Sequence, residues 1–270
     1  MTKFAAIQMA SSPHVRSNFL EADRLIKDAA EQGAELVVLP ENFALMGEEF
    51  DKLEYMEDDL EPGPIQEFLA KAANKYSVWV IGGTIPMVSD DPKKILAACL
   101  VYNEQGERVG RYDKMHLFDV SVPDSDEDYR ESSSIQPGHQ ELVVDSPFGM
   151  LGLAICYDLR FPELFRKLLG HGAEILITPS AFTAQTGAAH WEVLLRARAI
   201  ENLCYVVAPN QGGFHLNGRQ TYGHSMIIDP WGTVINRLDK GAGAVVAEID
   251  LERVEQVRKT FPAIEHRRIF

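Results

Sequence analysis

The chain has 270 residues, of which 46% are hydrophobic and 24% charged, and its formal net charge is -14. This composition excludes a disordered chain, and no apolar run is long enough for a spanning helix. The negative charge argues against nucleic acid or a membrane surface as a partner. The three cysteines form no CxxC pair, which argues against a disulfide framework and predicts a cytoplasmic location. The length favours a single domain over residues 1–270.

Short apolar runs typical of strands alternate with helical patterns along the chain. Runs rich in β-forming residues predict strands at 4–10, 35–40, 78–86, 150–158, 174–181, 204–211, 224–235 and 244–251, and a hairpin over 95–114. Helical periodicity predicts helices at 17–33, 65–76, 161–172 and 190–203. This order mixes βα units with hairpins, so we expect an α/β fold in which two sheets lie between helix layers.

Two long acidic segments, 47–64 and 119–140, interrupt this order without a regular pattern. Loops of this length in a compact domain are usually either covers over a functional site or disordered segments. The sequence leaves both possibilities open, including a mobile lid formed by residues 119–131.

Three chemically useful side chains stand where apolar strands end: Glu41, Lys114 and Cys156. Ligands in α/β folds collect outside the carboxyl ends of strands, so these ends can converge on one cleft. A carboxylate beside a thiol can act as a general base, and a lysine beside both can stabilise an oxyanion. The alternatives remain open: a turn carboxylate, a solvated hairpin lysine and a buried core thiol.

The remaining histidines and cysteines give weaker signals. His190 and His224 stand at the predicted start of a helix and of a strand, and we expect both to be structural histidines in the interior. Cys99 and Cys204 lie within strand patterns and are interpreted as core thiols. No HxH or HExxH spacing occurs, so no metal site is predicted.

Three segments together resemble a known family. LPENF (39–43), GRYDKMHLFD (110–119) and GLAICYDLRFPEL (152–164) are similar to the three signature segments of the nitrilase, or carbon–nitrogen hydrolase, superfamily. The similarity covers essentially the whole chain. It implies a hydrolase of linear amides with the four-layer α-β-β-α sandwich of the nitrilase type. It also implies pairing into a homodimer or a higher even oligomer, and no metal or organic cofactor.

The resemblance also implies roles for the residues in these segments. Glu41 is the expected general base, Lys114 stabilises the tetrahedral intermediate and Cys156 is the nucleophile. A further family glutamate corresponds to Glu131. The backbone N–H of Tyr157 is expected to complete the oxyanion hole. Clustered carboxylates are expected to raise one another's pKa values, which predicts a base poised near neutrality.

Residues around the nucleophile are candidates for substrate binding. Arg160 can bind a substrate carboxylate, or it can form an ion pair with Asp158 that anchors the turn. Phe182, Thr183 and Thr186 can line the pocket or simply pack in a loop.

Within the superfamily, the segments 179–211 and 222–234 are most similar to the deaminated glutathione amidases of the Nit branch. This similarity predicts a small ω-amide, deaminated glutathione, as substrate, and its hydrolysis through a thioester acyl-enzyme. The alternatives are an ω-amidase acting on α-ketoglutaramate or succinamate, and a binding protein that has lost catalysis on the same fold. The presence of Glu41, Lys114 and Cys156 argues against the last of these.

Overall fold

The computed structural model describes residues 1–47, 51–123 and 128–269 of the chain. Over these residues, one sheet has the strand order β17-β1-β2-β3-β5-β4, and β6 also pairs with β5. Its strands are β1 (Thr2–Gln8), β2 (Leu36–Val38), β3 (Trp79–Ile81), β4 (Ile85–Val88), β5 (Ile95–Tyr102), β6 (Arg108–Asp113) and β17 (Gly243–Ile249). We call it the first sheet.

The second sheet has the order β16-β15-β12-β11-β10-β9 within the described parts of the chain. Its strands are β9 (Val143–Ser146), β10 (Gly149–Leu153), β11 (Ile175–Ile177), β12 (Tyr205–Ala208), β15 (Ser225–Ile228) and β16 (Val234–Leu238). Two further pairs are β7 (Asp119–Ser121) with β8 (Asp128–Arg130), and β13 (Gly212–Phe214) with β14 (Gln220–Tyr222).

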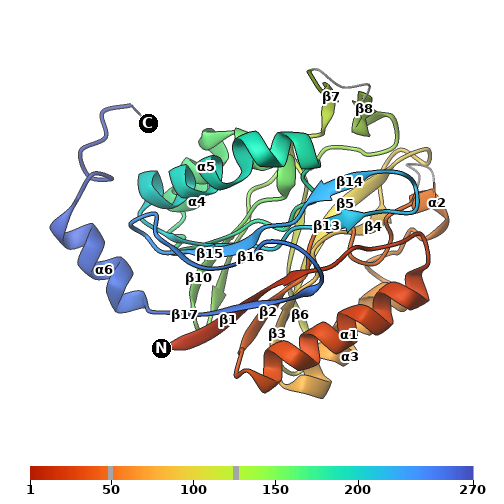
Figure 1. Ribbon diagram of the computed structural model, residues 1–270, viewed down its shortest axis with the longest axis horizontal. Coiled ribbons are helices and arrows are strands. Elements are labelled where there is room, and N and C mark those ends of the chain that lie inside the picture. Colours follow the sequence, from red (N-terminus) through yellow and green to blue (C-terminus); the bar gives the residue numbers. More distant parts are fainter. Residues whose placement is uncertain (48–50, 124–127, 270) are drawn as a thin grey trace.

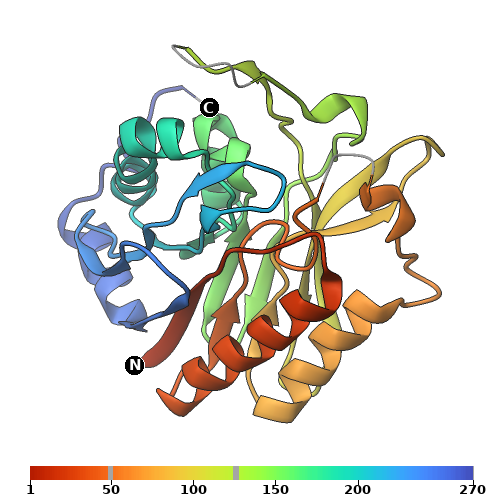
Figure 2. The same cartoon turned by 45° about the vertical axis from the view of Figure 1, so that its right-hand side comes forward.

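The two sheets pack face to face between layers of helices (Figures 1 and 2). Alternate residues of β1 face opposite ways, as a strand requires. Phe4 and Ala6 join the core shared with the second sheet, whereas Ala5 and Ile7 join a core formed with helices of the outer layer. The helices α1 (Val15–Glu31) and α3 (Pro64–Tyr76) form that outer layer. The helices α4 (Pro162–Gly170) and α5 (Ala184–Asn202) cover the second sheet. The arrangement is an α-β-β-α sandwich.

The smaller helical elements are α2 (Asp51–Glu54), α6 (Leu251–Thr260), and the 3₁₀ turns η1 (Glu131–Ser133) and η2 (Cys156–Arg160). None of the helices in the described ranges is long and apolar enough to cross a membrane.

Several element predictions are wrong in detail. The strand predicted over 78–86 is two strands, β3 and β4, which both pair with β5. The strand predicted over 224–235 is likewise the hairpin β15–β16, because Gly232 turns the chain at a φ of +85°. The last predicted strand, 244–251, ends at Ile249, and α6 follows it. The segment 119–140 is not wholly irregular, since it contains the β7–β8 pair and η1.

The strand directions bring Glu41 and Lys114 to the same end of the first sheet. The strands β1, β2 and β3 are parallel, and β6 runs in the same direction because it and β3 are both antiparallel to β5. Glu41 therefore follows the carboxyl end of β2, and Lys114 follows the carboxyl end of β6. In the second sheet, Cys156 follows the carboxyl end of β10.

Candidate active site

Cys156 is the first residue of η2 and lies at a sharp turn after β10. Its backbone has a φ of +46°, a left-handed conformation that few residues with a side chain adopt. Its N–H donates to the Pro179 carbonyl at 3.0 Å, and the residue is 8% exposed. Backbone strain of this kind persists where the surrounding structure holds it, and it is concentrated at functional sites.

Asp158 holds this turn in place. The carboxylate is fully buried and accepts hydrogen bonds from the Ile155 N–H at 2.8 Å and the Tyr112 hydroxyl at 2.7 Å. It also bonds to the His116 N–H at 3.0 Å and lies 2.7 Å from His116 Nδ1. Asp158 thus anchors the turn, as one alternative predicted, but among the described residues its partners are these and not Arg160. Because Tyr112 belongs to β6, the carboxylate ties the nucleophile turn to the first sheet.

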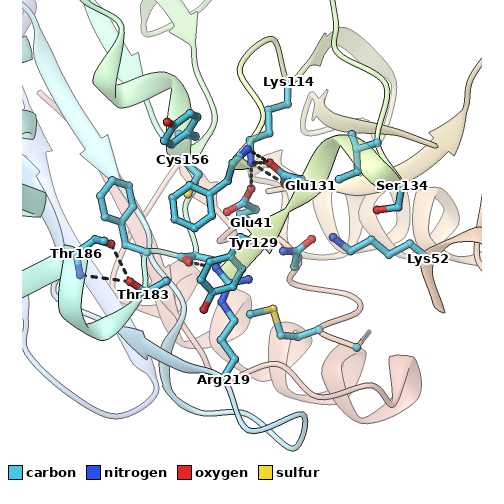
Figure 3. A pocket seen from close by; sticks show the side chains of 18 of the residues that line it. Glu41, Lys52, Lys114, Tyr129, Glu131, Ser134, Cys156, Thr183, Thr186 and Arg219 are labelled. Atoms are coloured by element: carbon cyan, nitrogen blue, oxygen red, sulfur yellow. Dashed lines mark hydrogen bonds and ion pairs between the residues drawn. The ribbon is translucent and has the colours of Figure 1, made fainter. Parts of the chain in front are cut away.

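Glu41, Lys114 and Glu131 form an ionic cluster beside Cys156, in which Glu41 and Lys114 are buried and Glu131 is partly buried (Figure 3). Lys114 Nζ lies 2.8 Å from Glu41 Oε1 and 2.8 Å from each carboxylate oxygen of Glu131. Glu131 Oε2 also accepts a hydrogen bond from the Phe118 N–H at 2.7 Å. The ammonium therefore bridges two carboxylates, and the structure places all three residues next to Cys156.

The charges of the cluster determine its protonation. Burial raises the pKa of Glu41, but the charge of Lys114 and hydrogen bonds from Lys114 and the Cys156 thiol outweigh burial, so the pKa is lowered overall. Burial and the Glu41 carboxylate raise the pKa of Cys156. Burial opposes the charge on Lys114, but Glu131 and Glu41 more than compensate and raise its pKa. The resting site thus holds a neutral thiol, a carboxylate and an ammonium. The prediction of a Glu41 pKa raised towards neutrality is wrong, because the charge and hydrogen bond of Lys114 outweigh the effect of burial.

Cys156 and this cluster open into a pocket of about 710 Å³. The pocket is lined by the predicted residues Tyr157, Arg160, Phe182, Thr183 and Thr186, among others. Thr183 also caps α5, because its hydroxyl accepts a hydrogen bond from the Thr186 N–H at 3.3 Å. The two threonines therefore combine helix capping with a position on the pocket wall.

Arg160 lies between aromatic rings on the α5 side of the pocket. Its guanidinium carbon is 5.7 Å from the centre of the Tyr157 ring and 5.4 Å from that of Phe182. Nη1 lies 3.2 Å from Nδ1 of His190. His190 is exposed in the middle of α5, so its predicted place in the interior is wrong. His224 is partly buried and stacks on the Tyr222 ring.

The pocket also contains residues that the sequence did not single out. Lys52 comes from α2, Tyr129 from β8, and Arg219 from the turn between β13 and β14. Lys52 and Tyr129 lie in the two acidic segments, where no periodicity marks a position. The Asn217-Gly218 pair before Arg219 is a typical hairpin-turn signal and was the available clue to that element.

Among the residues that the structure describes, no group of three or more His, Cys, Asp or Glu side chains could hold a metal ion. The arrangement instead provides a thiol, a neighbouring carboxylate and a buried ammonium at the end of an open pocket. These are the groups needed for nucleophilic attack on a carbonyl carbon.

Comparison with known proteins agrees with this chemistry. Residues 3–259 match the family model described as carbon-nitrogen hydrolase. The chain belongs to the carbon–nitrogen hydrolase family. It is therefore a hydrolase of carbon–nitrogen bonds other than peptide bonds. A deaminated glutathione amidase of Synechocystis is 46% identical over 266 residues, which are 97% of both chains.

Solved structures of this family share the fold. The yeast Nit3 protein, a member of branch 10 of the nitrilase superfamily, has a TM-score of 0.90 and 33% identity, and the match covers 99% of this chain and 97% of that one. The NitFhit protein of C. elegans has a TM-score of 0.87 and 38% identity over 99% of this chain. The chain spans 65% of NitFhit. These relatives confirm the sandwich of the nitrilase type and the resemblance to the Nit branch.

Proposed function

We propose that this hydrolase is a cysteine-dependent amidase whose substrate is deaminated glutathione, the amide of α-ketoglutarate with cysteinylglycine. The observation that carries the mechanism is the Glu41–Lys114–Glu131 cluster beside the strained Cys156. The names of the relatives support the substrate, since the one from Synechocystis is a deaminated glutathione amidase.

In the first half-reaction, the Glu41 carboxylate takes the thiol proton while Cys156 Sγ attacks the amide carbonyl carbon. The Lys114 ammonium and the Tyr157 N–H stabilise the oxyanion. Protonated Glu41 then gives its proton to the nitrogen as the carbon–nitrogen bond breaks. The amine leaves, and the acyl group remains on Cys156 as a thioester.

In the second half-reaction, Glu41 accepts a proton from water as the water oxygen attacks the thioester carbon. The carbon–sulfur bond then breaks, the free acid leaves, and the thiol recovers the proton. Glu131 keeps Lys114 in place through two hydrogen bonds of 2.8 Å and lies where it can position the water or the leaving group. Because Glu41 is unprotonated at neutral pH, it is available as a base in both halves.

Arg160 is the proposed partner of the α-keto acid carboxylate on the acyl half. Its guanidinium is held between two aromatic rings and is planar, which suits two parallel hydrogen bonds to a carboxylate. Phe182, Thr183 and Thr186 provide the wall along which the acyl chain extends.

A comparison of rates tests this function. We expect the purified protein to hydrolyse deaminated glutathione with a higher kcat/KM than α-ketoglutaramate, measured as release of cysteinylglycine and of ammonia. An equal or reversed preference identifies an ω-amidase. Absence of hydrolysis with both substrates rejects the amidase proposal and returns the chain to the binding-protein alternative.

The proposed setting of this activity is the cytoplasm, with the chain forming a single domain that pairs into a homodimer. The absence of a disulfide among the three free cysteines of the described residues supports a reducing compartment. Size-exclusion chromatography with light scattering tests the pairing, and a monomer at micromolar concentration contradicts it.

A further inference from the structure

The pocket is positively charged although the protein is strongly negative. The described residues that line it include two carboxylates and four cations, namely Glu41, Glu131, Lys52, Lys114, Arg160 and Arg219. The two glutamates outnumber Lys114, so that cluster carries one net negative charge, and the other three cations leave the lining with an excess of two positive charges. The chain as a whole has a formal net charge of -14, so this excess is a local property of the pocket. A pocket of this kind favours a ligand with more than one negative charge.

The proposed mechanism assigns no role to two of these cations, Lys52 and Arg219. In Figure 3, Lys52 lies across the pocket from Thr183 and Thr186, and Arg219 lies beneath Tyr129. We call Lys52 and Arg219 the distal cations. They belong to α2 and to the β13–β14 turn, which are separate from the elements that carry Cys156 and Arg160.

Neither distal cation forms an ion pair within the described residues. The Lys52 ammonium makes no hydrogen bond or ion pair there, although the side chain is half-buried. Arg219 donates from Nη2 to the Ala181 carbonyl at 2.8 Å, and its guanidinium carbon lies 5.1 Å from the centre of the Tyr129 ring. Its Nε is buried and has no hydrogen-bond partner in the part of the chain that the structure describes. A buried donor without a partner is costly, and a bound anion would remove that cost.

The positions of the acid and the base indicate which part of a substrate reaches these cations. Glu41 must contact the leaving nitrogen to protonate it, so the amine half lies on the Glu41 side of the scissile bond. Lys52 is on that side, because it lies across the pocket from Thr183 and Thr186, which belong to the wall assigned to the acyl half (Figure 3). Arg160 lies instead with Phe182 and α5, on the wall assigned to the acyl half.

We infer that Lys52 and Arg219 bind a carboxylate on the amine half of the substrate, while Arg160 binds the carboxylate of the acyl half. The substrate class is then an amide with one carboxylate on each side of the scissile bond, rather than a primary amide that releases ammonia. This inference rests on the proposed amidase function and adds a determinant for the leaving amine. Lys52 and Arg219 are binding residues in this account, with no role in proton transfer.

The test compares two substrates that differ only in that carboxylate: deaminated glutathione and its C-terminal carboxamide. We expect the wild type to prefer the free acid by about tenfold or more in kcat/KM, as a charge-assisted hydrogen bond in a partly buried site allows. Lys52→Met keeps the length of the side chain and should reduce this preference towards one. Arg219→Gln should do the same. Lys71→Met, which removes a cation from the exposed face of α3, is the matched control and should leave the preference unchanged.

The outcomes separate the inference from the function on which it rests. Lys52→Met and Arg219→Gln could lower kcat/KM for deaminated glutathione and for its carboxamide by the same factor. The preference for the free acid would then be unchanged and the inference wrong, although the amidase function would stand. If the wild type does not distinguish the acid from the carboxamide, the inference is also wrong. If the wild type hydrolyses neither of them nor α-ketoglutaramate, the proposed function itself fails. Thermal melts identify a variant that fails to fold, and the other variant then decides the question.

Discussion

Cys156 and Cys204 are two buried thiols at opposite ends of the parallel strands of the second sheet. The strands β10, β11 and β12 are parallel; Cys156 follows the carboxyl end of β10, and Cys204 directly precedes the amino end of β12. Burial raises the pKa of both thiols, that of Cys204 to about 11. Burial alone therefore does not distinguish them, and both are protonated at neutral pH.

Their neighbours do distinguish them. The Cys204 thiol donates to the Ala173 carbonyl at 3.2 Å and accepts from Arg258 Nη2 at 3.2 Å, so it is held among structural partners. The Cys156 thiol instead faces the Glu41 carboxylate and lines the pocket. A positive charge nearby thus does not make Cys204 a nucleophile. A nucleophilic thiol also needs a base that can take its proton and a space for the substrate. Within the described residues, both are present beside Cys156, at the carboxyl end of β10, and they do not occur together beside Cys204.

Removing each thiol is the strongest way to test this contrast. Cys156→Ala should lower kcat/KM by about 10⁴-fold or more, because the step that forms the thioester is lost. Cys204→Ala should retain activity and lower the free energy of unfolding by about 1 kcal/mol, since it removes only packing and weak hydrogen bonds. Steady-state rates and denaturant unfolding measure the two effects. Full activity of Cys156→Ala rejects the mechanism.

Two buried glutamates allow the same comparison for the base. Glu41→Gln keeps the shape but cannot accept the thiol proton, so kcat should fall by about 10²- to 10⁴-fold. Glu57 is equally buried, but its oxygens accept hydrogen bonds from the Ile65 and Gln66 N–H groups at 2.5 Å and 2.9 Å, at the start of α3. Glu57→Gln should therefore affect stability and leave kcat close to that of the wild type. Similar rates for both variants would contradict the role of Glu41.

The pH dependence provides a finer test of the contact between Lys114 and Glu41. The acid limb of kcat/KM reports the base in the free enzyme, and it should lie below the ordinary carboxyl pKa of 4.5, because Lys114 lowers the pKa of Glu41. Lys114→Met removes the cation and leaves burial unopposed, so Glu41 binds its proton at higher pH. The acid limb of the residual activity should then move to higher pH. An unchanged limb would show that Lys114 does not control the protonation of Glu41.

The sequence predicted the catalytic edge better than the rest of the pocket. Glu41 and Cys156 each follow an apolar strand and Lys114 ends the predicted hairpin, so a local pattern marked all three as candidates, and the family resemblance then assigned their roles. Glu131 had no such pattern and depended on family resemblance. The partners of Asp158 could not be read from the chain, because Tyr112 and His116 precede it by more than forty residues and meet it only when the sheets pack.

The helix boundaries that were missed have similar causes. We predicted that α5 begins at residue 190, whereas it begins at Ala184 after the Thr183 cap. Gly187 weakens the helical pattern there, but a Cβ at this position would lie 2.3 Å from the Tyr222 side chain, so the glycine permits close packing on β14. In α6, only Val254 and Val257 are buried, too few to give a visible periodicity. Tertiary packing determines both features, and a single sequence does not contain that information locally.

Detection of the acyl-enzyme tests the central claim most directly. The wild type is mixed with deaminated glutathione, quenched in acid within the first turnover, and analysed by intact mass and peptide mapping. The account predicts a transient α-ketoglutaryl thioester on the peptide that contains Cys156, and no adduct on the peptides that contain Cys99 or Cys204. Release of cysteinylglycine without any covalent adduct, or an adduct on another residue, would contradict it.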